Sequence, residues 1–169
     1  IRYCIGLPPE RWYEIADSLG ILIQNEYPVW TGGREGFSRI YPGLTSEHLA
    51  NEYRAWLPEH WNHPSVVIWD AQNESVTEII GEAINKVRGM DLSNRPWENG
   101  WSAPQADNDP IESHPYLFSR YRRGQAPSPR GPMADFFVNI QFPGNSAQSH
   151  LLPGDKTIYP NPIIINEYA

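Results

Sequence analysis

Short apolar runs alternate along the chain with longer segments in which apolar residues recur every three or four positions. Runs of the first kind are typical of buried strands and cover residues 21–27, 66–69, 95–101, 111–118 and 162–168, with the tail of one more strand at 2–6. Segments with helical spacing cover residues 12–19, 49–57 and 79–87. Strands that alternate with helices favour a parallel sheet built from βαβ crossovers. Between 119 and 161 only residues 133–140 are predicted to be helical.

The ends of the predicted helices are marked by residues with a defined conformational preference. Pro8 and Pro9 suit the first turn of a helix, and Gly20 suits its end. Thr45 or Ser46 is expected to cap the second helix, which Pro58 should bend or end.

Two predicted strands run directly into a glutamate. The apolar run Val66–Trp69 continues through Asp70 to Asn73 and Glu74, and Ile163–Ile165 continues through Asn166 to Glu167. A carboxylate just past the carboxyl end of a strand is where a (β/α) barrel places its chemistry. Two such glutamates on different strands are what a retaining glycosidase needs.

Composition narrows the classes of partner. The 169 residues correspond to one domain, 1–169, and the net charge of −7 argues against nucleic acid or an anionic membrane as partner. Seven Trp and nine Tyr would suit a carbohydrate substrate, because flat rings pack against the C–H face of a sugar. Trp30 and Trp101 are candidate platforms, with core packing as the alternative.

Other classes of site find little support. No P-loop or dinucleotide fingerprint is present, so we expect no cofactor. His60 and His63 precede the strand that leads to Glu74, at the end of a barrel that serves stability, so we expect no metal there. The chain opens at Ile1 without an initiator Met and is expected to be a piece of something longer, which leaves localisation open.

Three segments resemble the catalytic barrel of family 2 glycoside hydrolases, the family of β-galactosidases, β-glucuronidases and β-mannosidases. They are RWYEIADSLGILIQNE, EYRAWLPEHWNHPSVVIWDAQNES and PIIINEYA. The resemblance covers nearly the whole chain and thins between residues 119 and 161. It implies an α/β fold of the (β/α)8 TIM-barrel type, incomplete here, with roughly strands two to seven present.

The resemblance also implies roles for single residues. Glu74 matches the family's acid/base and Glu167 its nucleophile, while Asn73 matches the asparagine that hydrogen-bonds the sugar 2-hydroxyl. Arg2 resembles the arginine that contacts the nucleophile, and Tyr116 resembles a site tyrosine on the sixth strand.

The sequence also contains further candidate site residues and departures from the family pattern. His114 is a candidate pocket residue beside Tyr116, and Glu26 could bind a sugar hydroxyl or form a salt bridge. Ile5-Gly6-Leu7 replaces a His-Tyr-Pro context common in β-galactosidases, which puts galactose specificity in doubt. Asp70 and Gln72 occupy positions where small or neutral residues are more usual.

The chemistry requires the two carboxyl groups to lie about 5–5.5 Å apart, because the nucleophile bonds directly to the sugar. Glu167 must be ionised, which a neighbouring Arg2 would favour, and Glu74 must begin protonated. We therefore expect retaining hydrolysis of β-linked terminal sugars.

Two alternatives remain open. One is an inactive barrel fragment that binds sugar or forms a homo-oligomer through its open sheet edges. The other is an endo-acting barrel of the β-mannanase or cellulase kind.

Overall fold

The structure is a computed structural model that describes residues 1–30, 39–113 and 159–166. The elements along the chain are β1 (Arg2–Tyr3), α1 (Glu10–Leu19), β2 (Ile23–Glu26), α3 (Ser46–His60), β3 (Val66–Asp70), α4 (Glu78–Val87), the 3₁₀ turn η1 (Arg88–Met90), β4 (Trp97–Glu98), β5 (Ile111–Ser113) and β6 (Ile163–Ile165). Each predicted strand and helix that falls in the described ranges is present; most of the strands are shorter than predicted, whereas the helices are as long as predicted or longer. The predicted helix at 133–140 lies outside them.

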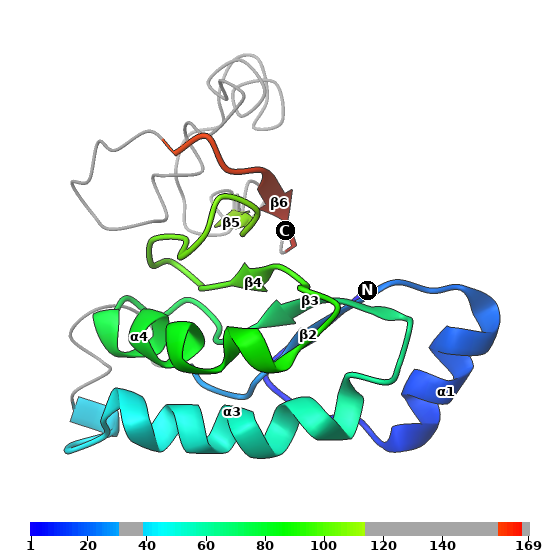
Figure 1. The fold of residues 1–169 in the computed structure, drawn as a ribbon, viewed down its shortest axis with the longest axis horizontal. Helices are drawn as coiled ribbons and strands as arrows, with labels where there is room; N and C mark the ends of the chain where they lie inside the picture. Colours follow the sequence, from blue (N-terminus) through cyan, green and yellow to red (C-terminus); the bar gives the residue numbers. More distant parts are fainter. Residues whose placement is uncertain (31–38, 114–158, 167–169) are drawn as a thin grey trace, which may run out of the picture.

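All described strands pair in parallel. Strands β1, β2, β3 and β4 form one sheet in that order, and β5 pairs with β6 in a second sheet. Helices α3 and α4 lie together along one side of the β2–β3–β4 strands, and α1 lies beside the N-terminus (Figure 1). Parallel neighbours joined by helical crossovers are the repeating unit of a (β/α) barrel.

The predicted helix ends agree closely with the structure. Helix α1 ends where Gly20 adopts the left-handed conformation with φ of 69°, and Thr45 caps α3 with a full capping box. Pro58 does not end α3, which continues two residues to His60.

Aromatic residues fill the space between the sheet and the helices. The rings of Trp56 on α3 and Trp69 on β3 lie 5.1 Å apart, and Trp97 on β4 packs 6.2 Å from Trp69. Because side chains alternate along a strand, Trp69 on the helix side leaves Asp70 on the opposite face, toward the interior of the barrel.

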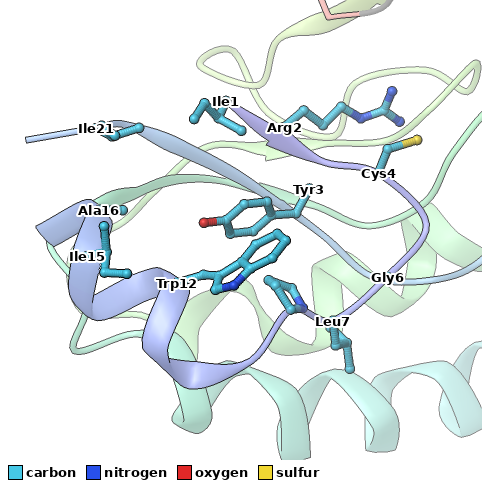
Figure 2. A pocket seen from close by; sticks show the side chains of 11 residues that line it. Ile1, Arg2, Tyr3, Cys4, Gly6, Leu7, Trp12, Ile15, Ala16 and Ile21 are labelled. Atoms are coloured by element: carbon cyan, nitrogen blue, oxygen red, sulfur yellow. The ribbon is translucent and has the colours of Figure 1, made fainter. Parts of the chain in front are cut away.

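Helix α1 buries Tyr13 and Ala16, whereas Trp12 and Leu19 stay exposed. Trp12 lies beside Tyr3, with 5.9 Å between the ring centroids, in an open apolar pocket of about 670 Å³ next to the edge strand β1 (Figure 2). Glu74 is not among the residues that line this pocket. Homo-oligomer formation through an open edge stays a prediction.

Among the described helices, none combines the length and the apolar character that crossing a bilayer requires.

Candidate active site

Four carboxylates meet at the carboxyl ends of four successive strands. Glu26 on β2 is in register with Asp70 on β3, and Asp70 is in register with Glu98 on β4. Glu112 lies on β5, and all four side chains are fully buried. We call these four residues the carboxylate cluster.

The guanidinium group of Arg2 lies among these carboxylates. Its Nε donates to Asp70 Oδ2 at 3.0 Å, and its Nη2 lies 2.6 Å from Glu26 Oε2 and 3.1 Å from Glu112 Oε1. The contact with Glu112 connects the β1–β4 sheet to the β5–β6 sheet. Arg2 therefore links strands β1, β2, β3 and β5 at the mouth of the barrel.

Burial and mutual repulsion shift the acidities in the cluster. Burial raises the pKa of Glu26 to about 8, reinforced by the neighbouring Asp70 and opposed by Arg2. Burial also raises the pKa of Glu98 well above its usual range, with further repulsion from Glu112 and Asp70. A side-chain hydrogen bond with Asp70 favours the protonated form of Glu98 further. A neutral, protonated Glu98 is the form that suits this position.

In Arg2, unlike in Glu26 and Glu98, the charged form is the one that the surroundings favour. Burial alone would lower the pKa of its guanidinium, but the carboxylates, Asp70 and Glu112 first, raise it above its usual value. Arg2 therefore carries a permanent positive charge at the centre of the cluster.

Glu74, the predicted acid/base, follows β3 by four residues and has a left-handed backbone with φ of 48°. Its Oε2 accepts a hydrogen bond of 3.1 Å from Nε1 of Trp30, an exposed residue in the loop after β2. The backbones of Trp30 and Asn73 also form a parallel bridge. A left-handed conformation is unfavourable for glutamate, and such strain is often found at functional sites.

Asn73 lies between Glu74 and the cluster. Its side chain is buried, and its Oδ1 accepts a hydrogen bond of 2.8 Å from Arg2 Nη2. Arginine can only donate, so the carbonyl of the amide must face Arg2 and the amide NH₂ must face the other way.

The strand that leads to the predicted nucleophile reaches the same site. Asn166, directly after β6, donates from Nδ2 to Glu112 Oε1 at 3.2 Å. Glu167, His114 and Tyr116 lie outside the described residues, so their predicted roles stay predictions.

The structure brings together the predicted residues Arg2, Asn73, Glu74 and Glu26. Glu26 forms the salt bridge that was the alternative to sugar binding. Trp101 is half-buried in the segment after β4. Trp30, for which a sugar platform and core packing were the alternatives, is exposed and contacts Glu74 itself.

Sequence reasoning missed Glu98 and Glu112 and left Asp70 unexplained. A signal was present, because each of the strands β2, β3 and β4 ends in an acidic residue, and Glu112 follows Ile111 on β5. One acidic side chain at the same level of neighbouring strands indicates a shared layer inside a barrel.

A parallel sheet with helical crossovers and polar side chains gathered at its carboxyl ends defines an α/β barrel of the enzyme type. The family model described as "Glycosyl hydrolases family 2, TIM barrel domain" matches residues 8–107. The chain therefore belongs to this family, and the predicted fold class is confirmed as part of a TIM barrel.

Relatives are found among the sugar hydrolases. The chain is 28% identical over 166 residues to a β-galactosidase of Oenococcus oeni, which covers 94% of this chain and 14% of that protein. It is 33% identical over 66 residues to a β-galactosidase of Vibrio vulnificus, covering 38% of this chain and 6% of that protein. The chain thus spans only a small part of the relatives it matches.

Solved structures show the same fold. A β-glucuronidase from Ruminococcus gnavus in complex with D-glucaro-d-lactam aligns with a TM-score of 0.59 and 18% sequence identity, covering 99% of this chain and 28% of that one. The apo structure of a β-glucuronidase from the same organism aligns with a TM-score of 0.56 and 19% identity, covering 99% of this chain and 28% of that one.

Proposed function

We propose that these residues form the catalytic part of a retaining glycoside hydrolase that acts on β-linked terminal sugars. The observation that supports this most directly is the arrangement Arg2–Asn73–Glu74 at the carboxyl ends of β1 and β3. A fixed cation, a buried amide and a strand-end carboxyl group are the groups that acetal cleavage with retention uses.

In the first step Glu167 attacks the anomeric carbon while Glu74 gives its proton to the leaving oxygen. The bond from that carbon to the leaving oxygen breaks, and a covalent glycosyl-enzyme forms. In the second step Glu74 takes a proton from water, which attacks the same carbon and releases Glu167.

Trp30 supports this assignment because it holds the Glu74 carboxyl group from one side. Its indole N–H donates to Oε2, so the transferable proton belongs on Oε1. Trp69, which is close in sequence, packs in the helix layer beside Trp56 and does not set the environment of Glu74.

Arg2 serves the nucleophile in this scheme. As a permanent cation next to the strand-end carboxylates, it favours the ionised form that a nucleophile needs. The proposed partner is a carbohydrate with a β-linked terminal sugar. β-Galactosidases and a β-glucuronidase are among the relatives and neighbours, so β-galactosides and β-glucuronides are the first substrates to test.

The test is covalent labelling of the full-length gene product with an aryl 2-deoxy-2-fluoro-β-glycoside, followed by peptide mass spectrometry. We expect one label, on Glu167. The matched variants are Glu74→Gln, expected to lower kcat by about 10³-fold, and Glu82→Gln on the exposed surface of α4, expected to change nothing.

Other outcomes identify the alternatives. A label on another residue, with Glu167→Gln fully active, refutes the assignment. Sugar binding without turnover of any aryl β-glycoside supports a non-catalytic module. Chain-length products from a polysaccharide support an endo-acting enzyme.

A further inference from the structure

Asp70 has no role in the proposed reaction, yet it is fully buried at the site and touches its cation. It lies at the end of β3, four residues before Glu74, and its Oδ2 accepts the hydrogen bond from Arg2 Nε at 3.0 Å. It is therefore a candidate for a residue that acts through Arg2.

The Asp70 carboxylate is itself held from two directions. Gln24 on β2 donates from Nε2 to Asp70 Oδ2 at 2.7 Å, and the backbone N–H of Gln72 donates to Oδ1 at 3.3 Å. The carboxylate can only accept from Gln24, so the amide of Gln24 is fixed with its NH₂ toward Asp70. Asp70 thus presents a positioned acceptor to Arg2.

Asp70 contacts Arg2 at a different atom from Glu26 and Glu112, which both lie at Nη2. Arg2 belongs to the two-residue strand β1, and a long arginine side chain loses considerable rotamer freedom when it is fixed. Asp70 binds the Nε side of the guanidinium plane, and with that side held, Nη2 lies 2.8 Å from Asn73 Oδ1. Because the guanidinium group is planar and rigid, a contact that fixes Nε also fixes the direction in which Nη2 points.

We propose that Asp70 is a positioning residue: through Arg2 it fixes the amide of Asn73, so that the Asn73 NH₂ is presented as a donor to the 2-hydroxyl of the bound sugar. The sequence Gln24 NH₂, Asp70 carboxylate, Arg2 guanidinium and Asn73 carbonyl has donors and acceptors in strict alternation. Reversal of the amide of Gln24 would place two acceptors face to face, and reversal of the amide of Asn73 would place two donors face to face. This inference rests on the proposed function, because its readout is hydrolysis.

The test compares two substrates in the full-length gene product: an aryl β-glycoside and its 2-deoxy analogue. In Asp70→Asn the new NH₂ must replace either Oδ1, which accepts from the backbone N–H of Gln72, or Oδ2, which accepts from both Gln24 and Arg2, so one of these donors then faces another donor. We expect kcat/KM to fall by about 100-fold for the parent glycoside and by less than about fivefold for the 2-deoxy analogue. A purely structural role would lower both substrates by the same factor.

Asp91→Asn is the matched control. Asp91 is also a buried carboxylate paired with an arginine, Arg95, but it lies before β4 at the opposite end of the sheet. We expect this variant to lose stability and to keep the wild-type ratio between the two substrates.

A second variant covers the case in which Asp70→Asn does not fold. Gln24→Leu keeps the Asp70–Arg2 contact and removes the donor that orients the carboxylate, so we expect a loss of about tenfold, again confined to the parent glycoside. An unchanged substrate ratio in either folded variant overturns the positioning role.

The failure of the proposed function would be recognised separately. If the wild-type protein hydrolyses no β-glycoside, a crystal structure of whichever of the two variants folds decides the question. In Asp70→Asn we expect the guanidinium of Arg2 to be displaced, and in Gln24→Leu we expect it to be turned about its kept contact with Asp70; in both its contact with Asn73 should be lost. Unchanged positions of both side chains overturn the proposal.

Discussion

The two ends of the parallel sheet handle buried charge in opposite ways. Before β4, at the amino end, Arg95 pairs with Asp91 at 2.9 Å, and Asp91 also accepts the indole N–H of Trp69. Near the start of β3, His63 lies between Asp17 and Glu10. At the carboxyl end four acidic side chains surround the guanidinium of Arg2, and burial together with repulsion raises the pKa of Glu98 well above its usual range.

This difference separates stability from chemistry. At the amino end each buried charge has an opposite charge and aligned donors, which is how a buried ion pair becomes favourable. The carboxyl end keeps excess negative charge, protonated carboxyl groups and a strained residue, Glu74, all of which cost stability. Such costs are expected where a protein has to bind and react.

The largest effect on stability is expected from Arg95→Met at the amino end. Arg95 also donates to the carbonyl oxygens of Val66 and Trp61, so its loss leaves Asp91 without its opposite charge and removes a donor from each of the two carbonyls. The unfolding free energy should fall by about 3 kcal/mol, measured by urea unfolding. Hydrolysis per folded molecule should stay near wild type. A folded but inactive variant would contradict the division between the two ends.

Glu98→Gln should act in the opposite direction. Because the pKa of Glu98 is raised in the folded state, its contribution to stability is complete below the unfolded value of 4.5 and is lost as pH rises through the folded value. Glutamine has no charge to desolvate, so at pH 9 the variant should be more stable by about 1–3 kcal/mol. The gain should vanish near pH 4. The measurement is chemical unfolding of Glu98→Gln and the wild type at both pH values, and a stability difference that is the same at pH 4 and pH 9 would contradict the prediction.

Replacement of His63 should lower the free energy of unfolding by a smaller amount, and this amount should depend on pH. Although burial opposes it, the hydrogen bonds that the His63 ring donates to Asp17 and Glu10 raise the pKa of His63. The stabilisation is therefore present below pH 6.5 and is lost as pH rises through the folded pKa. The pKa of Asp17 is lowered, so its share is lost only as pH falls below 3.8.

His63→Ala should consequently cost about 1–2 kcal/mol at pH 5.5 and less at pH 9, as measured by chemical unfolding. Hydrolysis should be unaffected when corrected for the folded fraction. A cost that grows with pH would show that His63 is stabilised as a neutral ring.

The smallest effect concerns the backbone of Glu74. Glycine adopts a φ of 48° without the steric cost that glutamate has. Glu74→Gly should therefore be about 1 kcal/mol more stable than Glu74→Gln, while both variants lose hydrolysis. Thermal unfolding of the pair measures the difference, and equal stability would mean that the strain is absent.

Much of the fold could be predicted because local signals agree with tertiary packing. Gly20 and Thr45 mark helix ends that the structure reproduces. The apolar run of β3 and the glutamate that follows it identified a strand end as a candidate site of catalysis. Period and capping depend on neighbours in sequence, so the sequence contains that information.

The carboxylate cluster could not be predicted in the same way. Glu98 and Glu112 stand on strands of two and three residues, too short for a clear alternation. Their proximity to Arg2 depends on the register of strands that are distant in sequence. The contact between Trp30 and Glu74 likewise joins two loops across 44 positions of the chain.

The placement of Trp69 and Asp70 side by side on β3 makes this strand intolerant of insertions and deletions. One added or lost residue within 66–70 would exchange the two faces, setting a carboxylate among the indoles of Trp56 and Trp97 and an indole against Arg2. An insertion or deletion of one codon would therefore disrupt both the aromatic layer and the active site. Homologous genes should accordingly show no length variation within this strand.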